Sequence, residues 1–276
     1  MIRLKSKEEI RILREGGRRL AAILSHLAAM LKPGVDTADL EALALKMIKE
    51  TGGRPAFKDY PMGRGIFFPS ALCVSINDEV VHGASLPSRL IKSGDIVDLD
   101  IGMEWPVEAR LRAEFKAPFN QFSSQGGFFT DTCVTVGVGK VSAEAKKLLR
   151  VTKECLAEAI ALARPGNNLL DIARAVERRA LKHGYGVVRD LVGHGLGYFA
   201  HEEPDVLNFV PNQRSEADLV LEPGLVIAIE PMINLGSWEV KSAANAYTVV
   251  SADGSISAHF EHSVAITEEG PLILTR

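Results

Sequence analysis

The stretch ALARPGNNLLDIARAVERRALKHG, residues 161–184, repeats the pattern of an earlier stretch, MLKPGVDTADLEALALKMIKETG, residues 30–52. In both stretches a Pro-Gly pair separates two helical patterns, and Pro165-Gly166 aligns with Pro33-Gly34. Such a pair ends one helix, and the polar residues after it cap the next. Each half of the chain is therefore predicted to begin with two helices. The expected helices cover residues 7–31, 37–51, 142–163 and 168–183.

The repeat continues into apolar stretches that carry acidic residues. LIKSGDIVDLD aligns with LVLEPGLVIAIE, which places Asp100 on Glu230, and FFTDTCVTV aligns with HFEHSVAIT, which places Asp131 on Glu261. The second acidic residue follows the first by the same number of positions in both halves. We therefore expect an α+β fold of two similar halves related by pseudo-twofold symmetry. No linker rich in Pro, Gly or Ser divides them, so residues 1–276 are predicted to form one domain.

The composition is that of an ordinary globular protein. Hydrophobic residues make up 46% and charged residues 24% of the 276 residues, and the net charge is −3. This balance gives no positive field that would attract nucleic acid or a membrane surface. No apolar run approaches the roughly 20 residues that span a bilayer, and the N-terminus does not read as a signal peptide. Three widely spaced cysteines, at positions 73, 133 and 155, favour a reducing, cytoplasmic location over a disulfide framework.

Four carboxylates within apolar strands require an explanation. A salt bridge would account for any one of them taken alone, because a buried carboxylate is costly unless it is paired or bound to a metal. All four would converge near the pseudo-twofold axis and repel one another, and no matching set of Lys or Arg residues is present. A pair of divalent ions is the economical explanation, and carboxylates suit Mn, Fe, Co and Zn. The four residues are Asp100, Asp131, Glu230 and Glu261.

Three histidines are candidates for metal ligands or for catalytic groups beside such ions. His194 lies in a Gly-His-Gly-x-Gly setting that lets the backbone approach closely, and neutral imidazole is a common ligand for these metals. His201 precedes Glu202 and is either a second ligand or a proton-bearing group. His82 follows NDEVV, and a role as an ordinary surface residue is as good an interpretation as a role in the site. Carboxylates with one imidazole indicate metal-assisted hydrolysis, in which a Glu can also carry a proton.

Residues 103–127 do not fit the repeat. This stretch, MEWPVEARLRAEFKAPFNQFSSQGG, contains two prolines and has a poor apolar period. A long connection between two strands is one interpretation. A lid or a partner-binding element is the other, because long loops are often functional.

Taken together, seven motifs resemble those of methionine aminopeptidases, specifically the short bacterial type I form. The motifs are CVSINDEVVHG, SGDIVDLDIG, TDT, GHGLG, HEEP, IEPM and FEH. The resemblance covers nearly the whole chain and implies a pita-bread fold, in which helices back a central curved antiparallel sheet with a dinuclear metal site. It implies a cytoplasmic, monomeric enzyme that uses two divalent ions (Co, Mn, Fe or Zn) to remove the initiator methionine from nascent polypeptides. Association with the ribosome would fit that role.

The resemblance also implies a role for each site residue. The implied metal ligands are Asp100, Asp131, His194, Glu230 and Glu261, of which Asp131 and Glu261 would bridge the two ions. Glu230 would shuttle a proton for the bridging water. His82 would contact the scissile amide nitrogen, and His201 the carbonyl or tetrahedral oxygen. The methionine side chain would occupy a pocket at Phe68, Cys73 and Tyr247, where apolar and polarizable contacts suit a thioether.

The chain departs from the family pattern at three places. Ala200 stands where many members have Phe before the HEEP histidine, and Tyr247 stands where bacterial members often have Trp. Both differences predict a pocket of altered shape. Asp100 and Asp131 are also much farther apart in sequence than usual, and most of the excess lies in the atypical insertion at residues 103–127.

Two other functions remain open. A proline-directed aminopeptidase or dipeptidase of the same fold usually carries a large additional N-terminal domain, whereas only residues 1–72 precede CVSIN here. A catalytically silent binding protein on this scaffold would have lost metal ligands, and all five are present in this chain.

Overall fold

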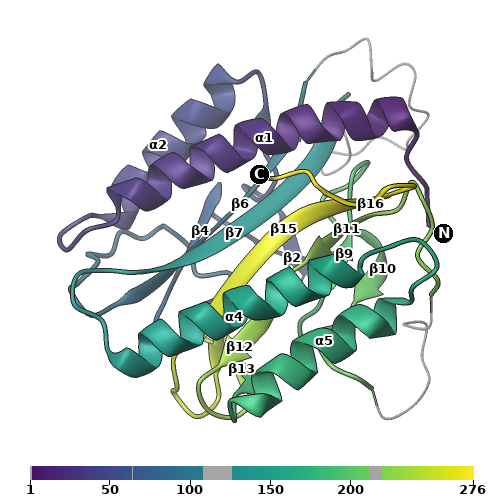
Figure 1. The fold of residues 1–276 in the computed structure, drawn as a ribbon. Helices are drawn as coiled ribbons and strands as arrows, with labels where there is room; N and C mark the ends of the chain where they lie inside the picture. Colours follow the sequence, from purple (N-terminus) through teal and green to yellow (C-terminus); the bar gives the residue numbers. More distant parts are fainter. Residues whose placement is uncertain (1, 64, 108–125, 212–218) are drawn as a thin grey trace.

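The structure is a computed structural model and describes residues 2–63, 65–107, 126–211 and 219–276. Its helices are α1 (Lys7–Met30), α2 (Thr37–Glu50), α4 (Ala143–Leu162) and α5 (Leu169–Lys182). Its strands are β1 (Arg54–Pro55), β2 (Pro61–Gly63), β3 (Ile66–Phe67), β4 (Leu72–Ile76), β5 (Glu79–Val81), β6 (Ile96–Trp105), β7 (Phe128–Gly137), β8 (Gly186–Val187), β9 (Gly193–Gly195), β10 (Glu202–Val206), β11 (Val226–Ile229), β12 (Met232–Asn234), β13 (Val240–Ser242), β14 (Val249–Ser251), β15 (Ser257–Thr267) and β16 (Gly270–Ile273). Within the described ranges, eleven of these strands form one antiparallel sheet, and the helices pack against it (Figure 1).

The four helices confirm the predicted ones, and their first turns show why they begin where they do. The Ser6 hydroxyl accepts the backbone N–H of Glu9, whose carboxylate in turn accepts the backbone N–H of Ser6. Asn168 and Asp171 form the same reciprocal pair at the start of α5. Each pair satisfies N–H groups that a helix start otherwise leaves without a partner.

Alternation along the central strands separates the core from the site. On β6, Val97, Leu99 and Ile101 are fully buried in a cluster with apolar residues of α1 and α2. Successive side chains of a strand point to opposite faces, so Asp98 and Asp100 lie on the face away from these helices. This placement of the two aspartates confirms the prediction made from the pattern.

The two halves of the molecule meet where β7 pairs with β15. Cys133 lies opposite Asp100 of β6 on one side and opposite Glu261 of β15 on the other. In Figure 1, α1 and α2 accompany the strands of the first half, and α4 and α5 those of the second. This arrangement confirms the predicted α+β fold with a central antiparallel sheet backed by helices.

β6 continues past Asp100 to Trp105. The two acidic pairs have the same spacing in sequence but different connections between their members. β6 and β7 are neighbours in one ladder, whereas three further strands (β12, β13 and β14) lie between Glu230 and Glu261. Most of the stretch predicted as an atypical insertion, residues 103–127, lies outside the described residues.

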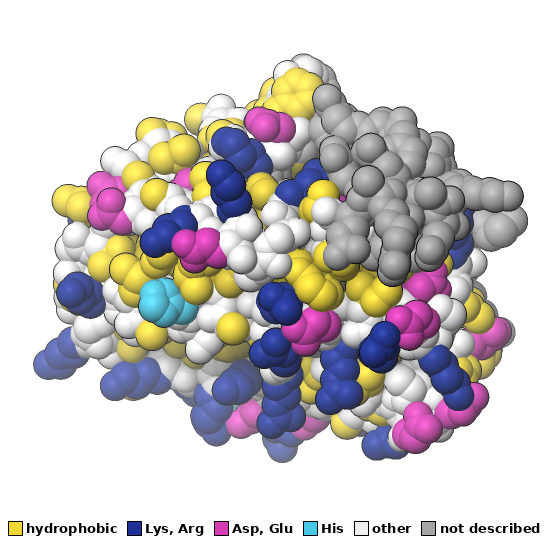
Figure 2. Space-filling view, turned by 90° about the horizontal axis from the view of Figure 1, so that it is seen from above, with side chains coloured by type: hydrophobic (Ala, Val, Ile, Leu, Met, Phe, Trp, Pro, Cys, Tyr) yellow, Lys and Arg dark blue, Asp and Glu magenta, His cyan; other side chains and the backbone are white. Residues whose placement is uncertain are grey.

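The face seen in Figure 2 carries basic and acidic side chains side by side. On α1, the carboxylate of Glu8 pairs with Arg11, and that of Glu15 pairs with Arg18 and Arg19. Among the described residues of this face, these charges of mixed sign create no extended field of one sign. In the part of the chain that the structure describes, no helix is both long enough and apolar enough to cross a membrane.

Alanine substitutions at two adjacent glycines of α1 should have opposite effects on stability. A Cβ at Gly17 would lie 2.5 Å from the Leu274 carbonyl oxygen, whereas a Cβ at Gly16 would lie 3.4 Å from the Trp105 Cβ, an ordinary contact. We expect Gly17→Ala to lower the free energy of unfolding by about 1–3 kcal/mol through overpacking. The matched control, Gly16→Ala, should raise it by up to about 1 kcal/mol through helix propensity. Urea unfolding of both variants checks the prediction, and equal effects would contradict it.

Candidate active site

A cavity of about 750 Å³ opens on the face of the sheet that the helices do not cover. It collects nine of the ten residues that the sequence singles out for the site. They are Phe68, Cys73, His82, Asp100, Asp131, His194, His201, Glu230 and Glu261. The tenth, Tyr247, packs against Phe68 with ring centroids 5.6 Å apart and an interplanar angle of 85°.

Strand register brings three of the carboxylates together. Asp100 on β6 and Glu261 on β15 both lie opposite Cys133 of β7, and Asp131 is two residues before Cys133 on the same strand. Residues directly opposite each other, or two apart, share a face of the sheet. All three carboxylates are at most 7% exposed.

These carboxylates are buried, but some of their oxygens have no hydrogen-bond partner among the described residues. These oxygens are Asp100 Oδ1, Asp131 Oδ1 and Glu261 Oε1. Burial is the largest cause that raises the pKa of Asp131, to about 6, and burial together with the neighbouring carboxylates raises the pKa of Asp100 and Glu261 well above the usual range. The described residues that line the cavity include no Lys or Arg. A bound cation would compensate this charge.

The donor set fits a divalent metal. Oxygen atoms of Asp131 and Glu261 and a ring nitrogen of His194 lie within 4.8 Å of one another. Asp100 lines the same cavity, and Glu230 Oε1 is 3.4 Å from His194 Nε2. Carboxylates with one imidazole are a ligand set that Mn, Fe, Co and Zn accept.

Local backbone packing explains the glycines around His194. A Cβ at Gly193 would lie 2.4 Å from the Ala228 carbonyl oxygen, and one at Gly195 would lie 2.2 Å from that of Glu203. Only glycine allows β9 to lie between β10 and β11 at this distance. His194 Nδ1 lies 2.9 Å from the Gly195 carbonyl oxygen, so the tautomer that donates this hydrogen bond leaves Nε2 free for a metal.

His82 and His201 face the same cavity and do not belong to the ligand group around Asp131. Desolvation inside the cavity, with His194 and His82 nearby, lowers the pKa of His201 well below its usual range, although part of its side chain is exposed. Burial also lowers the pKa of His82, which hydrogen-bonds the backbone of Tyr247. Both imidazoles are therefore neutral at neutral pH and can exchange hydrogen bonds with a bound substrate.

The residues predicted to form a methionine pocket lie on the apolar side of the cavity. Phe68 and Cys73 are at most 3% exposed and pack in one cluster with Phe57 and the partly buried Met62. Ala200, one of the departures from the family pattern, is buried in the same cluster. An aromatic and sulfur-bearing surface of this kind suits an unbranched apolar side chain.

Sequence reasoning missed Tyr60. Its hydroxyl lies 2.8 Å from His201 Nδ1, and the two rings pack edge to face with centroids 5.1 Å apart. This contact fixes one ring nitrogen of His201 and leaves the other free. Tyr60 precedes the short strand β2 in a stretch with no regular period, so no sequence pattern identified it.

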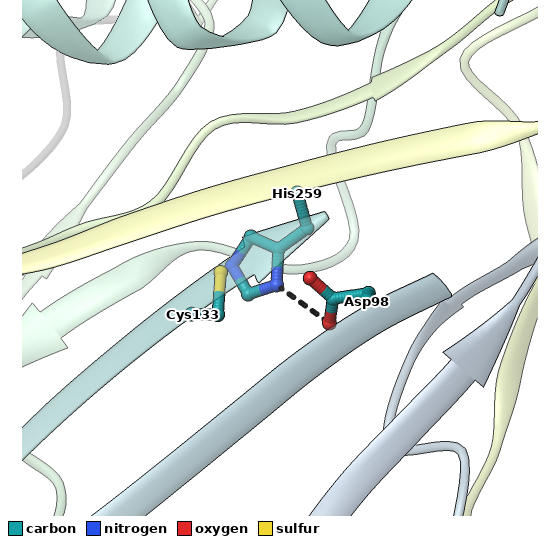
Figure 3. Close-up of side chains that lie close together, drawn as sticks. All are labelled: Asp98, Cys133 and His259. Atoms are coloured by element: carbon teal, nitrogen blue, oxygen red, sulfur yellow. Dashed lines mark ion pairs between the residues drawn. The ribbon is translucent and has the colours of Figure 1, made fainter. Parts of the chain in front are cut away.

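A second missed group lies deeper on the same face of the sheet. Asp98, Cys133 and His259 offer three potential ligand atoms within 4.8 Å of one another, and Figure 3 shows that they come from three neighbouring strands. His259 Nδ1 is 3.6 Å from Asp98 Oδ2, and His259 is 2% exposed. Counting back two residues from Glu261 along β15 would have identified His259, because alternate residues share a face.

The raised carboxyl pKa values predict how pH affects the metal-free protein. Unfolded carboxyl groups titrate near pH 4, whereas Asp131 titrates at about 6 in the folded chain. Between these values the folded state holds more protons, so this group's contribution to the free energy of unfolding decreases as the pH rises from about 4 to 7. In chelator, the Tm of the parent protein minus that of Asp131→Asn should therefore fall over this range. A difference that does not change with pH would contradict the prediction.

Comparison with known proteins agrees with this geometry. The profile of metallopeptidase family M24 matches residues 11–107 and 121–268. A methionine aminopeptidase of Aquifex aeolicus is 41% identical over 278 residues, covering 99% of this chain and 98% of that protein. Methionine aminopeptidase 1 of Bacillus subtilis is 40% identical, with both chains fully covered.

Solved structures extend the likeness to three dimensions. A methionine aminopeptidase from Thermotoga maritima has a TM-score of 0.84 at 36% identity, with all of both chains covered. A prolidase from Pyrococcus horikoshii has a TM-score of 0.72 at 20% identity, but this chain covers only 63% of it. The second likeness shows the fold alone. The chain therefore belongs to metallopeptidase family M24 and, within it, to the methionine aminopeptidases.

Proposed function

We propose that this protein hydrolyses the peptide bond after the N-terminal methionine of nascent polypeptides, using two divalent metal ions. One observation carries the proposal: three buried carboxylates with unpartnered oxygens lie beside His194 and Glu230, in a cavity that also has an apolar side. Such carboxylates would be costly without cations. The relatives that match over their full length are methionine aminopeptidases, and they supply the substrate class.

The metal ligands would be Asp100, Asp131, His194, Glu230 and Glu261, with Asp131 and Glu261 shared between the two sites. When bound, a pair of divalent ions lowers the pKa of a water molecule and polarises a carbonyl group. Mn, Fe, Co or Zn would serve, because each accepts a set of four carboxylates and one imidazole.

The protein's own side chains would bind the substrate and move the proton. Glu230 would take the proton of the attacking water and return it to the leaving amine. His82 would contact the scissile amide nitrogen. His201, held at Nδ1 by Tyr60, would present its other nitrogen to the carbonyl oxygen as charge develops there.

The apolar side of the cavity would bind the methionine side chain. Phe68 and Cys73 line it, and Tyr247 supports Phe68 from the same cluster. A thioether makes favourable contacts with aromatic edges and with a polarizable thiol. Processing of nascent chains implies a cytoplasmic location. A monomeric state and contact with the ribosome, both expected from the resemblance, stay predictions.

A paired peptide assay tests the proposal and separates it from its alternatives. Metal-stripped protein is reloaded with each candidate ion and incubated with peptides that begin Met-Ala-Ser, Met-Lys or Ala-Pro. Metal-dependent release of free methionine from Met-Ala-Ser alone is the expected result. Preference for Ala-Pro would indicate a proline-directed enzyme. Binding of metal without cleavage of any peptide would indicate a catalytically silent scaffold.

Single substitutions should separate ligands from substrate-binding residues. Asp131→Ala and Glu261→Ala should each lose bound metal and activity together, because each removes a ligand shared by both ions. His201→Ala should keep its metal but lose about 100-fold or more in kcat, the usual range for a group that stabilises charge or transfers a proton. Metal analysis and kinetics on the same preparations check this. Near-normal turnover by Glu261→Ala would refute the dinuclear mechanism.

A further inference from the structure

Glu230 differs from the three carboxylates of Asp100, Asp131 and Glu261 in how it is held. Those three sit within long strands, so the sheet fixes their direction. Glu230 follows the last residue of β11 and precedes Pro231, outside any strand. Its backbone carbonyl accepts a hydrogen bond from Asn208 Nδ2 at 3.0 Å, which holds the main chain but not the carboxylate. The direction of the Glu230 side chain therefore depends on what its two oxygens face.

Those two oxygens face two imidazoles. Oε1 is 3.4 Å from His194 Nε2, and Oε2 is 3.6 Å from His259 Nε2. The other ring nitrogen of His259 is 3.6 Å from Asp98 Oδ2. Asp98, His259 and Glu230 thus form a line that ends at the candidate metal site. His259 is 2% exposed, and neither of its ring nitrogens has a hydrogen-bond partner within the described structure.

Thr135 fixes the far end of this line. Its hydroxyl accepts the backbone N–H of His259 at 2.9 Å and lies 2.6 Å from the His259 carbonyl oxygen. The same hydroxyl is 3.1 Å from Asp98 Oδ1. One side chain therefore ties the β15 backbone at His259 to the carboxylate of Asp98. This contact sets the position from which the imidazole reaches Glu230.

A third ion between Asp98, Cys133 and His259 is a poorer interpretation of Figure 3. Both nitrogens of His259 already face carboxylates. The favoured role for His259 is therefore to contact a ligand of the neighbouring site.

We propose that His259, oriented by Asp98, is a positioning residue that holds the outer oxygen of Glu230, so that the inner oxygen stays directed at the metal site beside His194. The inference rests on the proposed function, because that function makes Glu230 a ligand. Outer partners of this kind fix the direction of a ligand and raise its affinity for metal.

Metal affinity, measured apart from activity, tests the role. His259→Leu should weaken binding of the more loosely held ion by about 10–100-fold, the usual effect of removing a ligand's outer partner. Titration calorimetry on chelator-stripped protein measures it. The kcat for a Met-Ala-Ser peptide should fall while KM changes by no more than about threefold. His259→Gln should recover most of the affinity, because its amide N–H₂ reaches about as far as Nε2.

Substitution of Asp98 provides a second test of the inference. Asp98→Asn should weaken metal binding in the same direction, and the double variant with His259→Leu should be no worse than His259→Leu alone, because both residues act through one contact. His262→Leu is the matched control. His262 lies on β15 but points to the other face, where its Nδ1 is 3.0 Å from the Thr275 hydroxyl. Its metal affinity should equal that of the parent protein.

Two results would overturn the inference. One is metal affinity within about twofold of the parent in both His259→Leu and Asp98→Asn. The other is a third bound ion per chain, with a thiolate-to-cobalt absorption band that Cys133→Ser removes. Circular dichroism checks the fold, and if His259→Leu does not fold, Asp98→Asn and His259→Gln still give the answer. Failure of the proposed function would look different, because the parent protein would then bind metal without releasing methionine.

Discussion

Repulsion among buried carboxylates is the constraint on which the rest of this structure depends. Asp100, Asp131 and Glu261 are brought onto one face of the sheet by strand register, and each leaves an oxygen without a partner. An apolar core would never place three such groups together, because each loses its hydration without gaining a counter-charge. The helices on the opposite face supply the stability that offsets this cost. The folded protein therefore contains an unfavourable electrostatic interaction, which a bound cation reduces.

Neutral side chains are suited to a cavity that already contains several buried carboxylates. Desolvation inside the cavity lowers the pKa of His82 and His201, which keeps both imidazoles neutral, and His201 is further fixed by the Tyr60 hydroxyl. Neutral imidazoles can donate and accept hydrogen bonds without adding charge to a site that already holds four carboxylates. The apolar side of the cavity, around Phe68 and Cys73, then offers a place for a substrate side chain away from the carboxylates.

The sequence predicted the local features of the fold well and the nonlocal ones less well. Capping residues and Pro-Gly pairs identified the four helices of the described residues, and alternation placed Asp98 and Asp100 on the face away from them. The register between β7 and β15 could not be predicted, because it joins residues that lie far apart in the sequence, such as Cys133 and Glu261. Tyr60 could not be found at all, since its role depends on where His201 arrives in space.

The pairing of β7 with β15 also has a consequence for how the protein is made. Four of the five candidate ligands lie in the first 230 residues, but Glu261 arrives only with β15, which precedes β16 in the same sheet. Until β15 emerges from the ribosome, the edge of β7 that pairs with β15 has no partner strand, and the apolar residues near it are not yet covered. The site can therefore be complete only after β15 has been synthesised. A chain that stops before β15 would have a partial ligand set and an exposed, aggregation-prone edge on β7, a state suited to chaperone binding rather than to catalysis.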